Sequence, residues 1–181
     1  MLRLYQMRKL LIFGRSPFIN KIDLSKIDYN KYDVCCINYP IFDIRVHYVV
    51  SVDSWTKPVL APKTEWISSN TGWEFIKSYE KKTHEEKRLS WACFSSSAAV
   101  SFAFLRGYKE VYLIGVDLKE NNEPMGHYDG TQNVFITKPS VCKKEKEYIA
   151  WYKDKIKIYQ TNPEVKDNWD IPYKDISEIL K

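Results

Sequence analysis

The segment of residues 95–117 constrains the fold of this chain more than any other. Three serines precede an apolar run, and Gly107 follows it. Serine caps helix starts and glycine favours the left-handed backbone that ends helices, so we predict a buried helix over residues 95–105. The apolar run at 111–117 predicts a core strand that follows at once. A helix leading directly into a buried strand is typical of an α/β fold.

Short apolar runs elsewhere repeat the strand pattern. An unbroken run of apolar residues indicates a strand buried on both faces, as in a parallel sheet. Further strands are expected at residues 10–13, 33–38, 46–52 and 156–159, and helices at 142–153 and 176–180. Residues 20–32 predict a short helical crossover. We therefore expect one Rossmann-like α/β domain over residues 1–181, with a mostly parallel sheet and flanking helices.

Two segments lack this pattern. Residues 54–91 hold four tryptophans and a run of charges, which indicates a solvated helix face or a loop. An aromatic oligomer surface is the alternative for this segment, and it keeps a homo-oligomer open. Residues 118–139 are polar and predict a long loop over one end of the sheet, where loops often carry function.

Composition argues against several classes of protein. The net charge is only +5 and the basic residues are scattered, so we expect no nucleic-acid partner. No apolar run approaches the roughly 18 residues of a membrane span, and none suits a secretory signal, which favours the cytoplasm. The cysteines lack zinc-site spacing, so we expect free thiols, no metal and no cofactor. They are Cys35, Cys36, Cys93 and Cys142.

Polar residues follow the predicted strands. Ligands of parallel sheets bind beyond the carboxyl ends of the strands. After the first strand, Gly14 permits a sharp turn, Arg15 adds charge, and the backbone N–H groups of the turn, including that of Ser16, suit a phosphate. Asn38 and Asp53 follow the next two strands and suit a base or ribose. An ordinary turn and loop capping are the structural alternatives for these residues.

The serines before the predicted helix suit a phosphate in the same way. Ser95 and Ser96 combine hydroxyls with the N–H groups of a helix start. Helix capping explains one of them without any ligand.

Among the histidines, only His127 is a candidate for acid–base chemistry. His47 falls within a predicted strand and His84 within the charge run, where packing or surface roles prevail. His127 lies in the long loop beside Tyr128, and histidine titrates near neutral pH. No HExxH or GxSxG pattern is present, which argues against zinc proteolysis and ordinary acyl hydrolysis.

Residues 9–18 and 95–117 carry a family resemblance. They resemble the bacterial sialyltransferases that use CMP-sialic acid, and the related Rossmann-like proteins around 6-hydroxymethylpterin diphosphokinase. The sequence Gly-Tyr-Lys-Glu at 107–110, before a strand ending Gly-Val-Asp, is the more specific match. The resemblance implies that Asn38 and Ser95 contact the nucleotide and that Asp53 lies near another contact.

The chain departs from that family at positions where the family has nucleotide-binding and catalytic residues. Arg15 stands where the family has asparagine, Tyr128 alone corresponds to two phosphate-contacting tyrosines, and Lys138 falls near the expected catalytic histidine. We expect a glycosyltransferase-like protein that binds a nucleotide-sugar such as CMP-sialic acid and transfers the sugar to the hydroxyl of a glycan acceptor without metal. His127 and Tyr128 would then be catalytic.

Two alternatives stay open. The first is a module that binds a nucleotide or nucleotide signal without catalysis. The second is a pterin-kinase-like phosphotransferase whose Mg²⁺ would need clustered carboxylates such as Asp53, Asp117 and Glu120.

Overall fold

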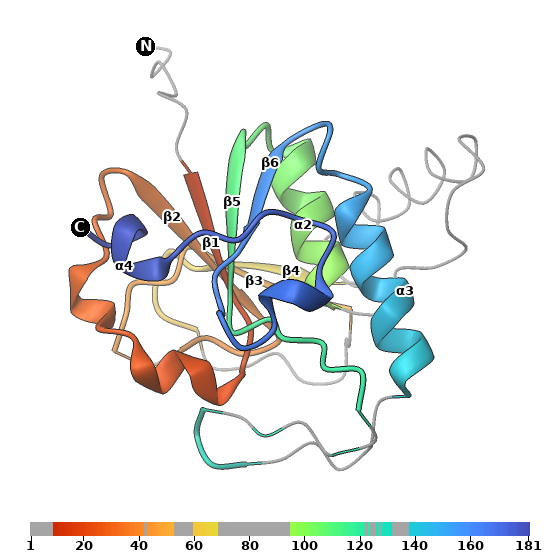
Figure 1. Ribbon diagram of the computed structural model, residues 1–181. Helices are drawn as coiled ribbons and strands as arrows, with labels where there is room; N and C mark the ends of the chain where they lie inside the picture. The colour runs from red at the N-terminus through yellow and green to blue at the C-terminus, as the bar shows by residue number, and fades with distance from the viewer. Residues whose placement is uncertain are drawn as a thin grey trace.

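A six-stranded sheet forms the centre of the protein in the computed structural model (Figure 1). The residues described are 9–41, 43–52, 60–68, 95–121, 123, 126, 128–131 and 138–181. The strands are β1 (Lys9–Phe13), β2 (Tyr32–Ile37), β3 (Tyr48–Ser51), β4 (Glu65–Ser68), β5 (Glu110–Ile114) and β6 (Lys157–Gln160). Their order is β4-β3-β2-β1-β5-β6, and every neighbouring pair is parallel. The predicted α/β class is confirmed, and the described sheet is wholly parallel.

Both faces of the sheet are covered. The helices α2 (Ser95–Leu105) and α3 (Pro139–Ala150) pack on one face, where the side chains of Leu10 and Ile12 point. Leu11 and Phe13 point to the other face and pack with the segment that includes the 3₁₀ helices and α4. Those elements are η1 (Pro17–Lys21), η2 (Leu24–Lys26) and α4 (Ile176–Ile179), seen on the side away from α2 and α3 in Figure 1. Burial on both faces explains why the strands read as unbroken apolar runs.

Helix α2 has the predicted bounds and the predicted stop. Its residues from Ser95 to Ala103 are buried, which suits a helix that is apolar on all sides. Gly107 takes a left-handed backbone, φ +83°, and its N–H donates to the carbonyl of Phe104 at 3.0 Å. The next residue, Tyr108, bonds back to Ala103, so the chain leaves the helix directly into β5.

Three expectations need correction. The interpretation of residues 54–91 as a solvated face or loop is wrong at Glu65–Ser68, which forms the edge strand β4 with Ile67 buried and Glu65 exposed. The crossover at 20–32 is short, as predicted, but its helix is the three-residue 3₁₀ helix η2, with Asp23 at its N-cap. Helix α3 starts earlier than predicted, since Pro139 suits the first turn of a helix.

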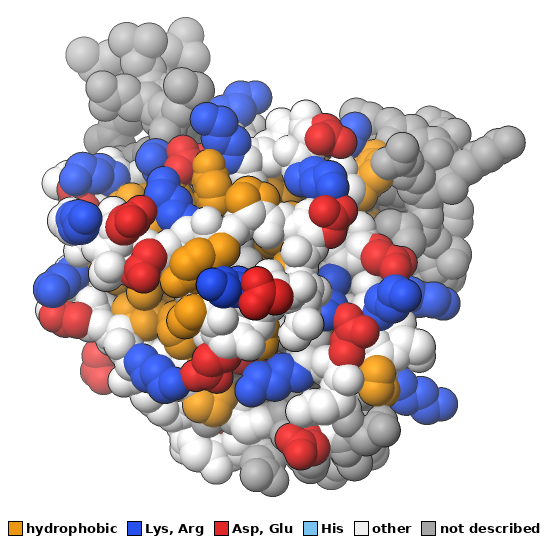
Figure 2. Space-filling view, in the orientation of Figure 1, with side chains coloured by type: hydrophobic (Ala, Val, Ile, Leu, Met, Phe, Trp, Pro, Cys, Tyr) orange, Lys and Arg blue, Asp and Glu red, His pale blue; other side chains and the backbone are white. Residues whose placement is uncertain are grey.

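Cys35, Cys36 and Cys142 are free and buried, as predicted, and Cys93 lies outside the described residues. Among the described residues, no helix has the length and apolar character to cross a membrane. On the face shown in Figure 2, basic and acidic side chains are interspersed.

Candidate functional site

The strand order reverses between β1 and β5, which lie side by side at the centre of the sheet. The chain leaves β1 toward β2 on one side, while β5 leads to β6 on the other. Such a switch point separates the loops that follow the two strands, and ligands of open α/β sheets bind there. The turn at Gly14 follows β1, so the structure places it at this point.

The turn at Gly14 touches the loop after β5 backbone to backbone. A Cβ atom on Gly14 would lie 2.2 Å from the carbonyl oxygen of Gly115, so only glycine fits. Gly115 has φ +65°, and its carbonyl accepts the N–H of Ser16 at 3.1 Å. The N–H of Gly14 donates to Ile114 at 2.8 Å. Two amides of the turn that were predicted to meet a phosphate are thus used within the protein.

Ser16, Asp117 and Asn162 form a side-chain network beside this contact. The Ser16 hydroxyl donates to Asp117 Oδ2, and Asn162 Nδ2 donates to Oδ1 at 2.9 Å. Ser16 Oγ also accepts the N–H of Phe18 at 3.2 Å and so caps η1. The network joins the ends of β1, β5 and β6. Sequence reasoning missed Asn162, although its position just after a predicted strand was a usable signal.

Asn38 and Ser95 meet at the same carboxyl edge. The Ser95 hydroxyl donates to Asn38 Oδ1 at 2.6 Å and accepts the N–H of Val52, just after β3, at 3.0 Å. Asn38 follows β2 and has φ +66°, a conformation that asparagine tolerates better than most residues. Two predicted contacts therefore touch each other. Asp53, the third, lies outside the described residues.

Ser96 has a different partner. Its hydroxyl donates to Oε1 of the buried Glu145 of α3 at 2.8 Å, and the Ser97 N–H donates to the same atom at 2.7 Å. Burial raises the pKa of Glu145, while the hydrogen bonds from Ser97 and Ser96 oppose that shift. A carboxyl of the protein itself thus holds the start of α2. No sequence signal marked Glu145, which lies in a run of charged residues.

Arg15 fixes the loop that contains Tyr128. Its Nη2 lies 2.6 Å from Asp129 Oδ2, and its carbonyl accepts the N–H of Tyr128 at 2.7 Å. The Asn20 side chain donates to the Tyr128 carbonyl at 2.8 Å. A hydrogen bond from the Thr131 hydroxyl, together with Arg15, lowers the pKa of Asp129 to about 2.

Tyr128 is the one described member of the predicted catalytic pair. It is half-buried, and burial raises the pKa of its hydroxyl. The hydrogen bond from its N–H to the Arg15 carbonyl places it against the Gly14 turn. His127 lies outside the described residues.

The two described carboxylates among those considered for Mg²⁺ have separate partners. Asp117 holds Ser16 and Asn162, whereas Glu120 forms an ion pair with Lys146 of α3. Across the part of the chain that the structure describes, no group of three or more His, Cys, Asp or Glu side chains is placed to hold a metal ion.

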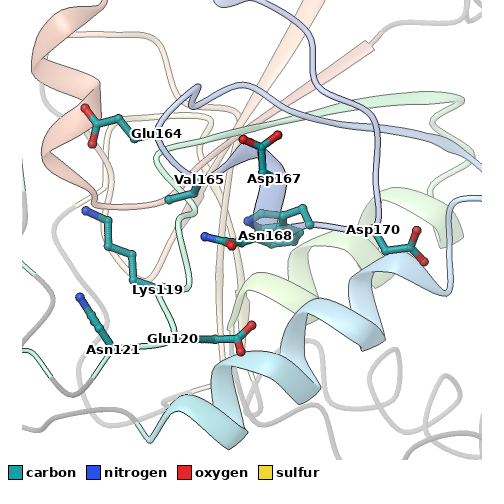
Figure 3. Close-up of a pocket in the computed structure, with 9 residues that line it drawn as sticks. Lys119, Glu120, Asn121, Glu164, Val165, Asp167, Asn168 and Asp170 are labelled. Atoms are coloured by element: carbon teal, nitrogen blue, oxygen red, sulfur yellow. The ribbon is translucent and has the colours of Figure 1, made fainter.

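A pocket of about 650 Å³ opens beside this edge (Figure 3). It is lined by residues 119–121 from the loop after β5 and by residues 164, 165 and 167–170 from the loop after β6. The latter loop contains the 3₁₀ helix η3 (Lys166–Asn168). None of the predicted contacts that the structure describes lines this pocket.

Comparison with known proteins identifies the fold. No protein-family model and no curated protein matches the chain. The chain is similar to the structure of the sialyltransferase CstII from Campylobacter jejuni in complex with the substrate analogue CMP-3FNeuAc, with 18% identity, a TM-score of 0.51, and coverage of 92% of this chain and 86% of that one. A mutant of the alpha-2,3/8-sialyltransferase CstII gives 15% identity and a TM-score of 0.54 at the same coverage. The chain therefore shares the α/β fold of these sialyltransferases.

Proposed function

We propose that this protein is a single-domain, glycosyltransferase-like nucleotide-sugar-binding protein. The observation that carries the proposal is the glycine contact at the switch point, where Gly14 and Gly115 bring the loops after β1 and β5 together beside Ser16 and Asp117. Ligands of this sheet type bind at that place. The similar CstII structure holds the substrate analogue CMP-3FNeuAc, which supports a CMP-sugar as the ligand.

The polar groups at the edge suggest how the nucleotide is held. Two amides of the Gly14 turn are occupied, so side chains must make most contacts. Asn38 and Ser95 offer amide and hydroxyl groups to the base and ribose. Asp117 carries negative charge and suits sugar hydroxyls better than phosphate. Arg15 supplies the positive charge of the turn. Its guanidinium contacts the phosphate once the ligand replaces Asp129 as its partner.

Ser96 and the loop complete the proposed site. Ser96 stabilises the start of α2 through its hydrogen bond to Glu145 and so helps to position Ser95. In the transfer reaction an acceptor hydroxyl attacks the sugar carbon, the bond from that carbon to the phosphate breaks, and His127 takes the hydroxyl proton. Tyr128 stabilises the departing phosphate charge without a metal. The acceptor is a glycan hydroxyl.

Thermal-shift measurements test the binding step. CMP, CDP, UDP, ADP and cyclic nucleotides are compared with and without Mg²⁺, since a ligand at 100 times its Kd stabilises by about 2.7 kcal/mol. We expect CMP to raise the Tm of the wild type and of Ser101→Ala, but not of Ser95→Ala. Ser101 lies on the same helix and bonds Tyr152 inside the core, so it is the matched control. A wild type that no nucleotide stabilises contradicts the proposal.

His127→Ala tests the chemical step. We expect it to abolish sugar transfer and to leave the CMP-induced shift intact, because the base acts on the acceptor and not on the nucleotide. Unchanged turnover would remove His127 from the mechanism.

A binding module without catalysis is the second candidate. It is favoured by Lys138, which precedes α3 near the position where the resemblance places a catalytic histidine, and whose side chain makes no capping hydrogen bond. CMP binding without release of sugar from CMP-sialic acid, in the presence or absence of glycans, would favour this candidate.

A further inference from the structure

The pocket between the loops after β5 and β6 has a polar lining with four carboxylates and one lysine, and three of the carboxylates pair with lysines outside the lining. Glu120 pairs with Lys146, Glu164 with Lys21 at 2.5 Å, and Asp170 with Lys153 at 2.6 Å. Two lining charges remain, on Asp167 and Lys119, and they have opposite signs. Neither has an ion-pair partner among the described residues. With the three outer lysines counted, the charges at the pocket balance, which suits an uncharged polar ligand better than a cation or a phosphate.

Trp169 lines the same pocket and carries a hydrogen-bond donor that has no partner within the described residues. The side chain is 7% exposed, and its indole N–H is buried with no hydrogen-bond partner in the part of the chain described. A buried indole N–H normally has a partner, so an unpaired one on a ring that lines a pocket favours a ligand that brings an acceptor.

The other lining groups extend this pattern. Asn121 and Asn168 add amides, which donate and accept, and Asp167 adds an acceptor (Figure 3). An apolar ring beside amide and carboxylate groups matches a sugar, which has C–H faces and a rim of hydroxyls. The volume of about 650 Å³ lies within the range of ordinary ligand pockets and admits one or two sugar rings.

We propose that this pocket binds a neutral sugar residue. Its two lining loops continue directly from Asp117 and Asn162, so the pocket adjoins the candidate nucleotide site. Its assignment as the acceptor glycan subsite rests on the proposed function, whereas sugar binding itself does not. Glu164 joins the two sites, because its partner Lys21 belongs to η1, which follows the Gly14 turn.

Binding of matched sugars tests this proposal. Methyl glucoside, methyl galactoside and lactose are the neutral probes, and glucosamine and glucuronate are charged counterparts of glucose. Saturation-transfer NMR gives the Kd of each for the full chain. We expect at least one neutral probe to bind more tightly than both charged sugars.

Substitutions locate the binding. Trp169→Phe keeps a ring but removes the N–H, and we expect it to weaken binding by about fivefold or more. Trp151→Phe is the control, since Trp151 lies at the end of α3 and does not line the pocket. Asp167→Asn and Asn168→Ala change exposed residues and test the pocket even if Trp169→Phe fails to fold.

The outcomes separate this proposal from the nucleotide proposal. The absence of binding by every neutral probe, preference for a charged sugar, or unchanged binding in Asp167→Asn and Asn168→Ala would each overturn the pocket assignment. The CMP-induced shift is measured on the same variants. A CMP shift without sugar binding refutes the pocket alone, and sugar binding without a CMP shift refutes the nucleotide site alone.

Discussion

Aspartates with polar partners lie at opposite ends of the sheet, and their surroundings differ. At the amino end, Asp33 accepts the Tyr108 hydroxyl at 2.7 Å and lies 3.6 Å from His47 Nε2. At the carboxyl end, Asp117 accepts the hydroxyl of Ser16 and the amide of Asn162. Asp33 and Tyr108 are both buried, and burial raises the pKa of Tyr108 far above its usual range, which keeps it a donor. Asp117 is half-buried and its partners come from loops.

The backbone around the two aspartates also differs. Left-handed residues directly follow two strands at the carboxyl end, namely Asn38 and Gly115, and Leu118 adds a third at φ +46°. Such conformations are costly for residues other than glycine and gather at ligand sites. Asp33 instead sits within β2, in regular pairing with Leu10 of β1. The amino-end network therefore suits a purely stabilising role, and the carboxyl-end network suits the ligand proposed above.

The largest expected effect is that of Gly14→Ala. The added Cβ would meet the Gly115 carbonyl, and we expect a loss of about 3 kcal/mol or more in the free energy of unfolding. Urea denaturation measures this loss. Gly126→Ala is the control, because its Cβ would meet only Pro17 at 3.6 Å, and its effect should stay within about 0.5 kcal/mol. Equal effects of the two substitutions would contradict the glycine contact.

Tyr108→Phe tests the amino-end network. Removal of the hydroxyl leaves Asp33 short of a donor, and we expect a loss of about 2 kcal/mol in unfolding free energy. The CMP-induced shift should not change. Tyr173→Phe provides the comparison, since that hydroxyl contacts Asp175 at the surface at 3.4 Å. If Tyr108→Phe also abolished the CMP-induced shift, the two ends of the sheet would not differ in their roles.

Ser16→Ala should have a smaller effect on stability than Tyr108→Phe but a larger effect on nucleotide binding. It removes the cap of η1 and a donor to Asp117, and we expect a loss of about 1 kcal/mol in stability. The nucleotide-induced shift should disappear, because Asp117 loses its orientation. Ser25→Ala removes an exposed hydroxyl that bonds Asp23 and is the control in the same thermal-shift series. Loss of the nucleotide response in both variants would argue against a specific role for Ser16.

The smallest expected effect is on the stability of the protein at low pH. The pKa of Asp129 is about 2 in the folded protein, below its ordinary value of 3.8. A lowered pKa means that the contribution of Asp129 to stability is present above pH 3.8 and is lost as the pH falls toward 2. Asp129→Asn should therefore have a flatter stability profile than the wild type in that window. NMR titration of the carboxyl carbon checks the pKa directly, and a value near 4 would show that Arg15 and Thr131 do not hold it.

Much of the fold follows from local pattern. The core strands read as unbroken apolar runs because both faces are covered, and the serines and Gly107 mark the ends of α2. Strand β4 escaped prediction because an edge strand is solvated on one side, and its four residues lie among charges and tryptophans.

The site was less accessible from the sequence. Asn38 was predicted as a contact because it follows a buried strand, and Ser95 because it precedes a buried helix, and the structure brings the two together at one edge of the sheet. Asn162 was missed although it follows a predicted strand, whereas Glu145 lies in a run of charged residues, and only packing brings it to Ser96. The roles of the predicted contacts, with Asp53 and His127 among them, remain predictions.

The glycine contact also limits how this sequence can diverge. The atom that a Cβ on Gly14 would strike belongs to the backbone of Gly115, not to a side chain that could be exchanged for a smaller one. No second substitution can therefore restore the space, and position 14 must stay glycine for as long as β1 and β5 remain neighbours. Distant relatives that have lost most other identities should still keep this residue at the end of their first strand.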